Sequence, residues 1–117
     1  MDYANYTCIR AERVRRVLTL TINRPDVLNA VNAALHEELS RIFYDAGADP
    51  DTDVVVLTGA GRAFCAGGDI DGRQEASDRP ESFEDTAVEA KKIIFGLLDC
   101  EKPIICRMNG DAVGLGA

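Results

Sequence analysis

The run Val54-Val55-Val56-Leu57-Thr58 constrains the fold of this 117-residue chain more than any other segment. It carries no charge and consists mainly of β-branched residues, which is typical of a strand that is buried on both faces of a sheet. Strands of this kind belong mainly to parallel sheets that helices cover. We therefore expect an α/β fold.

The segment before this strand predicts a crossover helix. Asn32 is a good N-cap, and apolar residues then recur at the spacing of one helix face, namely Leu35, Leu39, Ile42 and Phe43. We expect the polar residues of this helix to lie exposed to solvent on its other faces, and these are His36, Glu37, Glu38 and Arg41. The turn-rich residues 49–53 end the helix. A right-handed crossover would then join strand, helix and strand into a parallel sheet.

Two β-rich segments stand near the beginning of the chain. Residues 6–10 and 14–22 carry β-branched side chains with partial alternation, and residues 11–13 between them are expected to form the turn of a hairpin. Pro25 ends the second strand, because proline lacks the N–H group that a continuing ladder needs. The predicted fold therefore adds antiparallel strands at the edge of the parallel sheet.

The second half of the chain predicts another helix and another strand. The polar residues 72–80 are expected to form a mobile surface loop, and Ser82 can cap a helix over residues 83–98. We expect the inward face of this helix to carry Val88, Ile94 or Phe95, and Leu98. Residues 104–106 read as a short buried strand, and Asn109-Gly110 as the tight turn after it.

The charge balance and the cysteines exclude several classes of protein. The net charge of −7 opposes nucleic acid or an anionic membrane as a partner, because such binding needs Lys and Arg concentrated on one face. The apolar runs are shorter than the roughly 18 residues of a transmembrane helix. The first residues do not resemble a signal peptide, so we expect a cytoplasmic protein. The four widely spaced cysteines favour reduced, mostly buried thiols over disulfides, and no metal site is predicted.

Two glycine-rich corners follow predicted strands. The first runs from Gly59 to Asp69 through Ala66-Gly67-Gly68, and the second runs from Asn109 to Gly116. In a parallel sheet the loops at the carboxyl ends of the strands gather at one edge. N–H groups from two such corners could hold one carbonyl oxygen and stabilise negative charge on it. Ordinary tight turns are the alternative, and neither corner fits a phosphate loop, a dinucleotide loop or an EF-hand.

Four segments resemble the crotonase superfamily, that is, the enoyl-CoA hydratase/isomerase family. They are Thr21-Ile22-Asn23-Arg24-Pro25 with Leu28-Asn29-Ala30, Val56-Leu57-Thr58-Gly59, Phe64-Cys65-Ala66-Gly67-Gly68-Asp69-Ile70, and Lys102-Pro103-Ile104 with Asn109-Gly110 and Ala112-Val113-Gly114. They stand in the family's order and span nearly the whole chain. The resemblance implies an α/β fold of the crotonase-like ββα spiral type that is incomplete at the C-terminus. Residues 1–117 would be the N-terminal part of a single domain.

The resemblance also implies an oxyanion hole for a coenzyme A thioester. The family's pattern makes Gly68 the first N–H donor. It makes Leu115 the second donor, at a position where the family has the middle glycine of Gly-Gly-Gly. A leucine supplies the same N–H group if its φ is negative, whereas a positive φ would put the hole in doubt.

The same resemblance implies a set of substrate-binding residues, which are Arg24, Val27, Leu28, Ala30, Ala66, Gly67, Asp69, Ile70, Gly110 and Gly114. Val27, Leu28 and Ala30 are expected to line the coenzyme A groove. Residues 66, 69 and 70 are expected to meet the adenine and pantetheine parts through their backbone. Arg24 is a candidate for the phosphates, with a solvated loop arginine as the alternative. Asp69 could equally be a helix N-terminal residue that the helix dipole favours.

The resemblance predicts an acyl-CoA hydratase or isomerase, with hydration of a 2-enoyl-CoA thioester as the leading reaction and no separate cofactor. Family hydratases place one glutamate just beyond the second corner, at what would be position 118, and another further along. This chain alone is therefore expected to be inactive, as a truncated part of an enzyme that would form a homotrimer or hexamer at full length. A non-catalytic binding or assembly protein on the same scaffold is the alternative.

Overall fold

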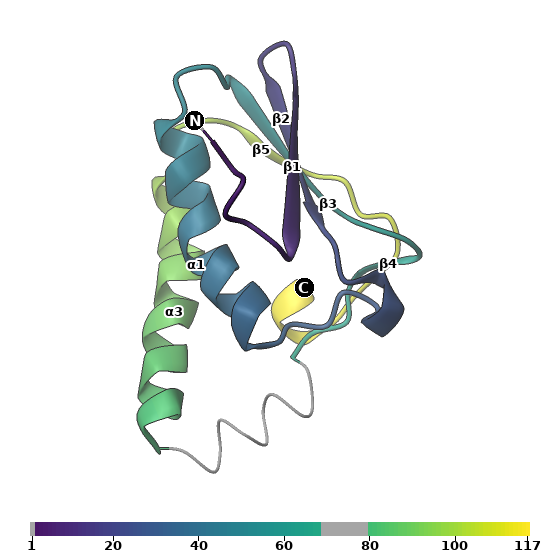
Figure 1. The fold of residues 1–117 in the computed structure, drawn as a ribbon, viewed down its shortest axis with the longest axis vertical. Helices are drawn as coiled ribbons and strands as arrows, with labels where there is room; N and C mark the ends of the chain where they lie inside the picture. Colours follow the sequence, from purple (N-terminus) through teal and green to yellow (C-terminus); the bar gives the residue numbers. More distant parts are fainter. Residues whose placement is uncertain (1, 69–79) are drawn as a thin grey trace.

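The computed structural model describes residues 2–68 and 80–117, which form a sheet with two helices on one side (Figure 1). The sheet has four strands in the order β1 (Ile9–Val14), β2 (Val17–Ile22), β3 (Val54–Gly59) and β5 (Ile104–Cys106). The helices are α1 (Ala33–Ala48) and α3 (Pro80–Asp99), and they pack against each other along their length.

The sheet is parallel except at one edge. β2, β3 and β5 run parallel, and β1 is antiparallel to β2. The connections through α1 and α3 are therefore crossovers, which confirms the α/β prediction. Because the three strands are parallel, their carboxyl ends lie at the same edge of the sheet.

Four short elements gather near this carboxyl edge. The strands β4 (Ala63–Cys65) and β6 (Asp111–Ala112) pair in parallel as a second, small sheet that the sequence did not predict. The 3₁₀ turn η1 (Pro25–Val27) follows β2, and the turn η2 (Gly114–Gly116) follows β6. These elements carry the two glycine corners.

The hairpin exists, but its predicted turn is wrong. β1 and β2 pair up to Val14 opposite Val17, so the chain turns at Arg15-Arg16 and not at residues 11–13. Arg15 has a φ of 56°, although arginine has no special preference for that region. The Arg16 guanidinium binds the Asp53 carboxylate at 2.7 and 2.9 Å. This distant partner helps to fix the turn, and it could not be read from the local sequence.

Helix α1 begins and packs as predicted. The Leu35 N–H donates a hydrogen bond of 2.9 Å to the Asn32 side chain, and the predicted apolar face is buried. The prediction that Glu38 and His36 are solvated is wrong. The Glu38 carboxylate is buried because it accepts hydrogen bonds from the backbone of residues 7–9. His36 Nδ1 lies 2.8 Å from a carboxylate oxygen of Glu89 in α3.

Helix α3 is present, but its inward face differs from the prediction. It begins at Pro80, so Ser82 lies within the helix. The residues expected to face inward are exposed instead, namely Val88, Ile94, Phe95 and Leu98, whereas Ile93 is buried. A Cβ atom on Gly96 would lie 3.3 Å from the Cβ atom of Phe43. The small residue lets the helices approach closely, and this contact selects the inward face.

Only one face of the sheet is fully covered by the described residues. Leu20 and Val55 are completely buried on the helix side. Val54 and Val56 point to the other side and are half-buried, and Ile105 is 55% exposed. The prediction that the strand over residues 54–58 is buried on both faces is therefore wrong for the part of the chain described. The prediction that residues 104–106 form a buried strand is also wrong, because β5 lies at the edge of the sheet and is partly exposed.

The structure also bears on the predictions for the cysteines, for membrane spans and for the surface loop. All four cysteines are free, but only Cys65 is buried and Cys106 is exposed, so the prediction of mostly buried thiols is wrong. Neither helix with a described course is long and apolar enough to cross a membrane. The predicted loop lies almost entirely at residues 72–79, outside the described part of the chain.

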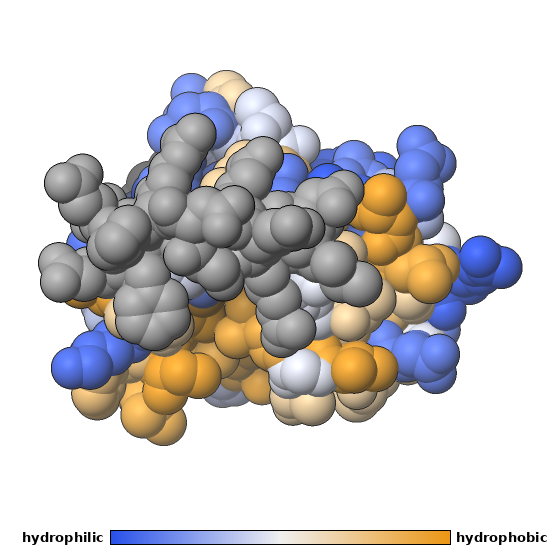
Figure 2. Space-filling view, turned by 90° about the horizontal axis from the view of Figure 1, so that it is seen from below, coloured by the Kyte–Doolittle hydropathy of each residue, from blue (hydrophilic) through white to orange (hydrophobic). Residues whose placement is uncertain are grey.

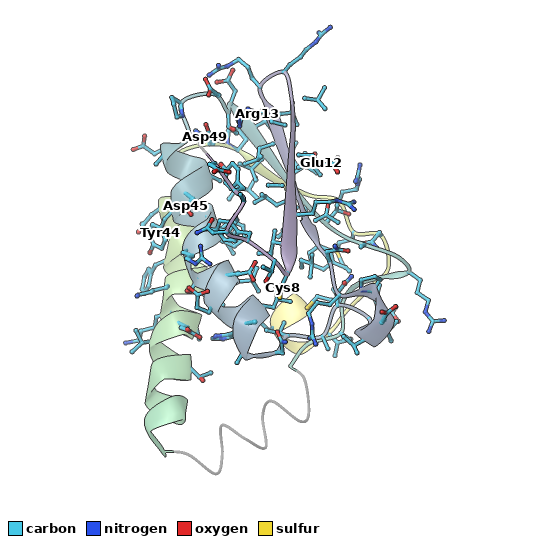
Figure 3. All side chains as sticks on the ribbon, in the orientation of Figure 1. Cys8, Glu12, Arg13, Tyr44, Asp45 and Asp49 are labelled. Carbon is cyan, nitrogen blue, oxygen red and sulfur yellow. The ribbon has the colours of Figure 1, made fainter. Side chains whose placement is uncertain are left out.

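Asp49 joins the N-terminal segment, β1 and the end of α1 (Figure 3). Its side chain is buried, and its carboxylate accepts hydrogen bonds from the Tyr3 hydroxyl at 2.8 Å and from the Thr52 hydroxyl at 2.9 Å. Arg13 Nη1 lies 3.3 Å from the same carboxylate. This cluster lies at the end of α1 opposite the carboxyl edge of the sheet, so it stabilises the scaffold and leaves the corners free.

Candidate functional site

The two glycine corners touch each other. Cys65 at the end of β4 pairs with Ala112 of β6, and the Val113 N–H donates a hydrogen bond of 3.0 Å to the Cys65 carbonyl oxygen. Gly67 has a φ of 90°, and a Cβ atom there would lie 2.8 Å from the Val113 carbonyl oxygen and 3.7 Å from Gly114 Cα. Glycine is required at position 67 by both the backbone angle and the lack of space.

The two expected N–H donors stand one residue beyond this contact. Among the described residues, the N–H groups of Gly68 and Leu115 have no hydrogen-bond acceptor. Leu115 is the second residue of η2, a position at which the N–H group of a helical turn has no partner within the turn. Its φ is not positive, so the condition for a leucine at this position is met.

The loop over residues 24–30 lies beside the first corner. The Leu28 carbonyl oxygen accepts a hydrogen bond of 3.1 Å from the Ala66 N–H, and the Val31 N–H donates one of 2.7 Å to the Gly67 carbonyl oxygen. Val27 and Leu28 are 43% and 37% exposed. The expected groove residues of this loop and of the first corner are therefore brought together, with Ala30 half-buried behind them.

Arg24 has a structural partner in this loop. Its side chain is half-buried, and the guanidinium Nη1 donates a hydrogen bond to the Ala30 carbonyl oxygen. Arg24 is therefore not the solvated loop arginine of the alternative interpretation, because its side chain is hydrogen-bonded to the other end of its own loop. Asp69 and Ile70 lie outside the described residues, and the phosphate role of Arg24 stays a prediction.

Gly110 and Gly114 are required to be glycine for different structural reasons. A Cβ atom on Gly110 would overlap the backbone carbonyl of Arg62 and lie 3.0 Å from Ala63 Cα, so this residue permits the second corner to pack on the first. Gly114 has a φ of 58° and is exposed, at the start of η2. The two residues therefore shape the corner through packing and backbone angle, respectively.

Two asparagines at this edge carry a role that the sequence did not predict. Asn29 is fully buried and Asn109 is exposed, and both side chains donate hydrogen bonds to the Ala63 carbonyl oxygen, at 2.9 and 3.0 Å. The predicted tight turn at Asn109-Gly110 is wrong, because the chain only bends at Gly110 and forms no hydrogen-bonded turn there. A polar amide beside a glycine corner was the available signal, but its partners are more than 30 residues away.

An apolar cavity of about 530 Å³ lies between the sheet, the helices and the second corner. Leu39, Phe43, Ile93 and Leu97 line it from the helices, and Leu115 and Gly116 line it from η2. Figure 2 views the lower end of the molecule, where hydrophobic residues reach the surface in several places beside hydrophilic ones. The second corner therefore borders a largely apolar space, and Leu115 belongs both to this corner and to the lining of the cavity.

The thiol of Cys65 is not prepared for nucleophilic chemistry. Burial raises the pKa of this thiol, and a hydrogen bond from the Gly67 backbone lowers it only in part. A raised pKa keeps the thiol protonated near neutral pH, whereas a cysteine nucleophile needs the thiolate. Backbone N–H groups, and not the cysteine, are the groups at this site that can stabilise an anion.

Known proteins resemble this chain over nearly its whole length. A family profile described as enoyl-CoA hydratase/isomerase matches residues 12–117. The chain is 38% identical over 103 residues to 1,2-epoxyphenylacetyl-CoA isomerase of Escherichia coli K12, and this match covers 86% of this chain and 39% of that protein. It is 34% identical over 114 residues to a probable enoyl-CoA hydratase of Rhodobacter capsulatus, and this match covers 97% of this chain and 42% of that protein.

A solved structure has the same arrangement of elements. The crystal structure of an enoyl-CoA hydratase/isomerase from Mycobacterium paratuberculosis superposes with a TM-score of 0.94 at 38% identity. The match covers 97% of this chain and 46% of that one. The chain thus spans about two fifths of the length of the curated relatives it matches.

Proposed function

The chain belongs to the enoyl-CoA hydratase/isomerase family, and from this premise we propose that its two glycine corners bind the carbonyl oxygen of a coenzyme A thioester. The N–H groups of Gly68 and Leu115 are the two donors. The observation that carries the proposal is the contact between Gly67 and Gly114, which brings two N–H groups without described acceptors close to one another. The thioester is the substrate, and no separate cofactor is needed.

Two N–H donors on one carbonyl oxygen act by stabilising negative charge. When a nucleophile adds to C3 of a 2-enoyl thioester, electrons move through C2 to the carbonyl oxygen and form an enolate. Donors that are already in place favour this state over the neutral substrate, and one such donor typically lowers a barrier by about 3 kcal/mol. Hydration is complete when C3 holds the hydroxyl of water and C2 takes up a proton.

We assign this chain the binding and polarisation part of that reaction. Hydration of a 2-enoyl-CoA is proposed for a protein in which the chain is extended to the length of its relatives, with the proton-transferring carboxylates in the extension. The loop residues Val27, Leu28 and Ala30, together with Ala66, would hold the coenzyme A portion. A homotrimer or hexamer is proposed for that longer protein.

Two other functions are the alternatives, and the names of the relatives favour one of them. The Escherichia coli relative is named an isomerase and the Rhodobacter capsulatus relative a probable hydratase, at similar identity to this chain. The shared residues therefore serve more than one reaction, and isomerisation is the alternative chemistry. A non-catalytic binding protein would keep the corners as well, and it would bind the thioester without turnover of any enoyl-CoA substrate in the extended protein.

The proposal is tested by carbonyl polarisation in the chain itself. Butyryl-CoA labelled with ¹³C at the thioester carbonyl should bind, and its carbonyl resonance should move downfield because both donors draw electron density toward oxygen. Free coenzyme A, measured by calorimetry, should bind more weakly. A butyryl-CoA resonance that stays at its free position in the presence of excess protein would overturn the proposal.

The second donor can be removed without changing a side chain. Residues 106–117 can be synthesised and joined at Cys106, with the α-hydroxy acid analogue of leucine at position 115, so that an ester oxygen replaces the N–H group. We expect the downfield shift to fall strongly, while the all-amide chain made by the same ligation keeps it. An undiminished shift in the ester chain would show that Leu115 is not a donor.

A further inference from the structure

The hydrogen bonds of Asn29 and Asn109 converge on one turn of the chain. Asn29 Nδ2 donates to the carbonyl oxygens of Ala60 and Ala63, both at 2.9 Å, and its Oδ1 accepts from the Arg24 N–H at 2.8 Å. The Asn109 side chain bonds the same turn, which spans residues 59–63. Each amide uses its oxygen and both of its hydrogens, so neither hydrogen is spare.

Asn109 repeats the pattern from the other side. Its Nδ2 donates to the carbonyl oxygens of Gly61 at 2.9 Å and Ala63 at 3.0 Å, and its Oδ1 accepts from the Gly59 N–H at 3.1 Å. The Ala63 carbonyl oxygen thus accepts from both asparagines, which matches its capacity for two hydrogen bonds. In Figure 1 the three segments, η1, the start of β4 and the loop after β5, meet at the lower right.

We propose that Asn29 and Asn109 are positioning residues that fix the distance between the two N–H donors, an inference that rests on the proposed function. Asn29 ties the loop over residues 24–30 to the turn that leads into β4 and on to Gly68. Asn109 ties the segment that leads into β6 and on to Leu115 to the same turn. Both donors are therefore placed relative to one carbonyl oxygen, that of Ala63.

The backbone around the turn is too close-packed for a looser arrangement. A Cβ atom on Gly59 would lie 2.6 Å from the Ala63 carbonyl oxygen and 2.9 Å from Asn29 Nδ2. Gly110 follows Asn109 directly, and a side chain there would overlap the Arg62 carbonyl. Glycine at these two positions allows the asparagines to reach the turn from both sides.

The hydrogen bonds of Asn29 and Asn109 to the turn over residues 59–63 require an amide side chain. Aspartate has nearly the same shape as asparagine, but at neutral pH it presents two acceptor oxygens and no donor. At position 109 it would face the carbonyl oxygens of Gly61 and Ala63 with negative charge. We expect the second corner to move away from the first, which separates the donors without removing either of them.

Asn109→Asp is the main test, because Asn109 is exposed. The core should tolerate a substitution there more easily than one at the buried Asn29. In the full chain we expect the variant to stay folded and to bind free coenzyme A as before. Its affinity for butyryl-CoA should fall about tenfold, as expected for the weakening of one donor. The downfield shift of the labelled carbonyl should fall with it. Asn5→Asp makes the same change at an exposed position away from the site and should leave both quantities unchanged.

The outcomes separate the two proposals. No carbonyl shift with the wild-type chain would overturn the proposed function itself. A wild-type shift that Asn109→Asp and Asn109→Ala both retain would overturn the positioning role alone. Equal loss of affinity for butyryl-CoA and for free coenzyme A, or loss of the fold in both variants, would also overturn it, because the role would then be purely structural.

Discussion

Asp49 shows how one buried carboxylate holds several parts of the chain together. Burial by itself raises the pKa of this group, but hydrogen bonds from the Asp51 N–H, Tyr3 and Thr52, together with the charge of Arg13, outweigh it and lower the pKa from 3.8 to about 2. The same contacts act on Tyr3, where burial first and then the Asp49 hydrogen bond raise the pKa of the phenol. The cluster is therefore most stable when Asp49 is ionised and Tyr3 is neutral.

This shift predicts an acid-sensitive contribution to stability. A group whose pKa is lower in the folded state stabilises the fold above its unfolded pKa and loses that contribution as the pH falls through the folded value. The contribution of Asp49 should therefore be complete above about pH 4 and should disappear as the pH falls toward 2. Asp49→Asn should cost about 2 kcal/mol in free energy of unfolding at pH 7, because it leaves buried donors poorly paired.

Urea unfolding at a series of pH values checks this prediction. The difference in free energy of unfolding between wild type and Asp49→Asn should shrink between pH 4 and pH 2. Asp26→Asn, at an exposed position in η1, should follow the wild type throughout. A difference that is constant over this pH range would contradict the assignment.

At the scale of elements, a single side chain of α1 organises the start of β1. The Glu38 carboxylate accepts hydrogen bonds from the Thr7 N–H at 2.9 Å, the Cys8 N–H at 3.0 Å and the Ile9 N–H at 3.3 Å. The Thr7 hydroxyl adds another at 3.0 Å. The helix thus supplies acceptors to an edge strand that has a sheet partner on one side only.

Glu38→Gln should loosen this edge without unfolding the sheet. Glutamine keeps one acceptor oxygen but turns an NH₂ group toward backbone donors, so we expect a loss of about 2 kcal/mol. Amide hydrogen exchange should speed up most at Thr7, Cys8 and Ile9. Glu37→Gln is the matched control, because Glu37 is exposed on the same helix and pairs only with Arg41 among the described residues. Equal exchange rates in the two variants would contradict the role of Glu38 in holding residues 7–9.

At the scale of the whole molecule, the described residues leave apolar surface open. Val88, Ile94, Phe95 and Leu98 of α3 are exposed, and Leu98 is 72% exposed. Ile105 is exposed on the uncovered face of the sheet, and Val113 is exposed at the second corner. Exposed apolar side chains can favour association between molecules when they gather into a patch.

Leu98→Lys should therefore weaken concentration-dependent association of the chain. Lysine is a good helix former and its charge suits the last turn of a helix, so the free energy of unfolding should change by less than about 0.5 kcal/mol. Val14→Lys is the matched control, because Val14 is also 72% exposed but lies at the end of the hairpin and not on α3. Sedimentation velocity over a concentration series measures the effect. Association that both substitutions reduce equally would contradict a role for the α3 surface.

The sequence by itself determined the features that depend on neighbours within one or two turns of chain. The sequence predicted the Asn32 cap, the buried face of α1 and the end of β2 before Pro25. It also predicted the chain order of the two helices and of the strands of the larger sheet, because propensity and periodicity are local. The two glycine corners were also visible, and the parallel order of the strands indicated that they would meet.

Only the tertiary structure decided which distant partner each remaining residue finds. It buried Glu38, paired His36 with Glu89, turned the Ile93 face of α3 inward and moved the hairpin turn to Arg15-Arg16. It also gave the asparagines their common acceptor at Ala63. The physical reason is the same in each case. A polar group or a small residue is compatible with many local environments, and its energy is set by atoms that folding brings from elsewhere in the chain.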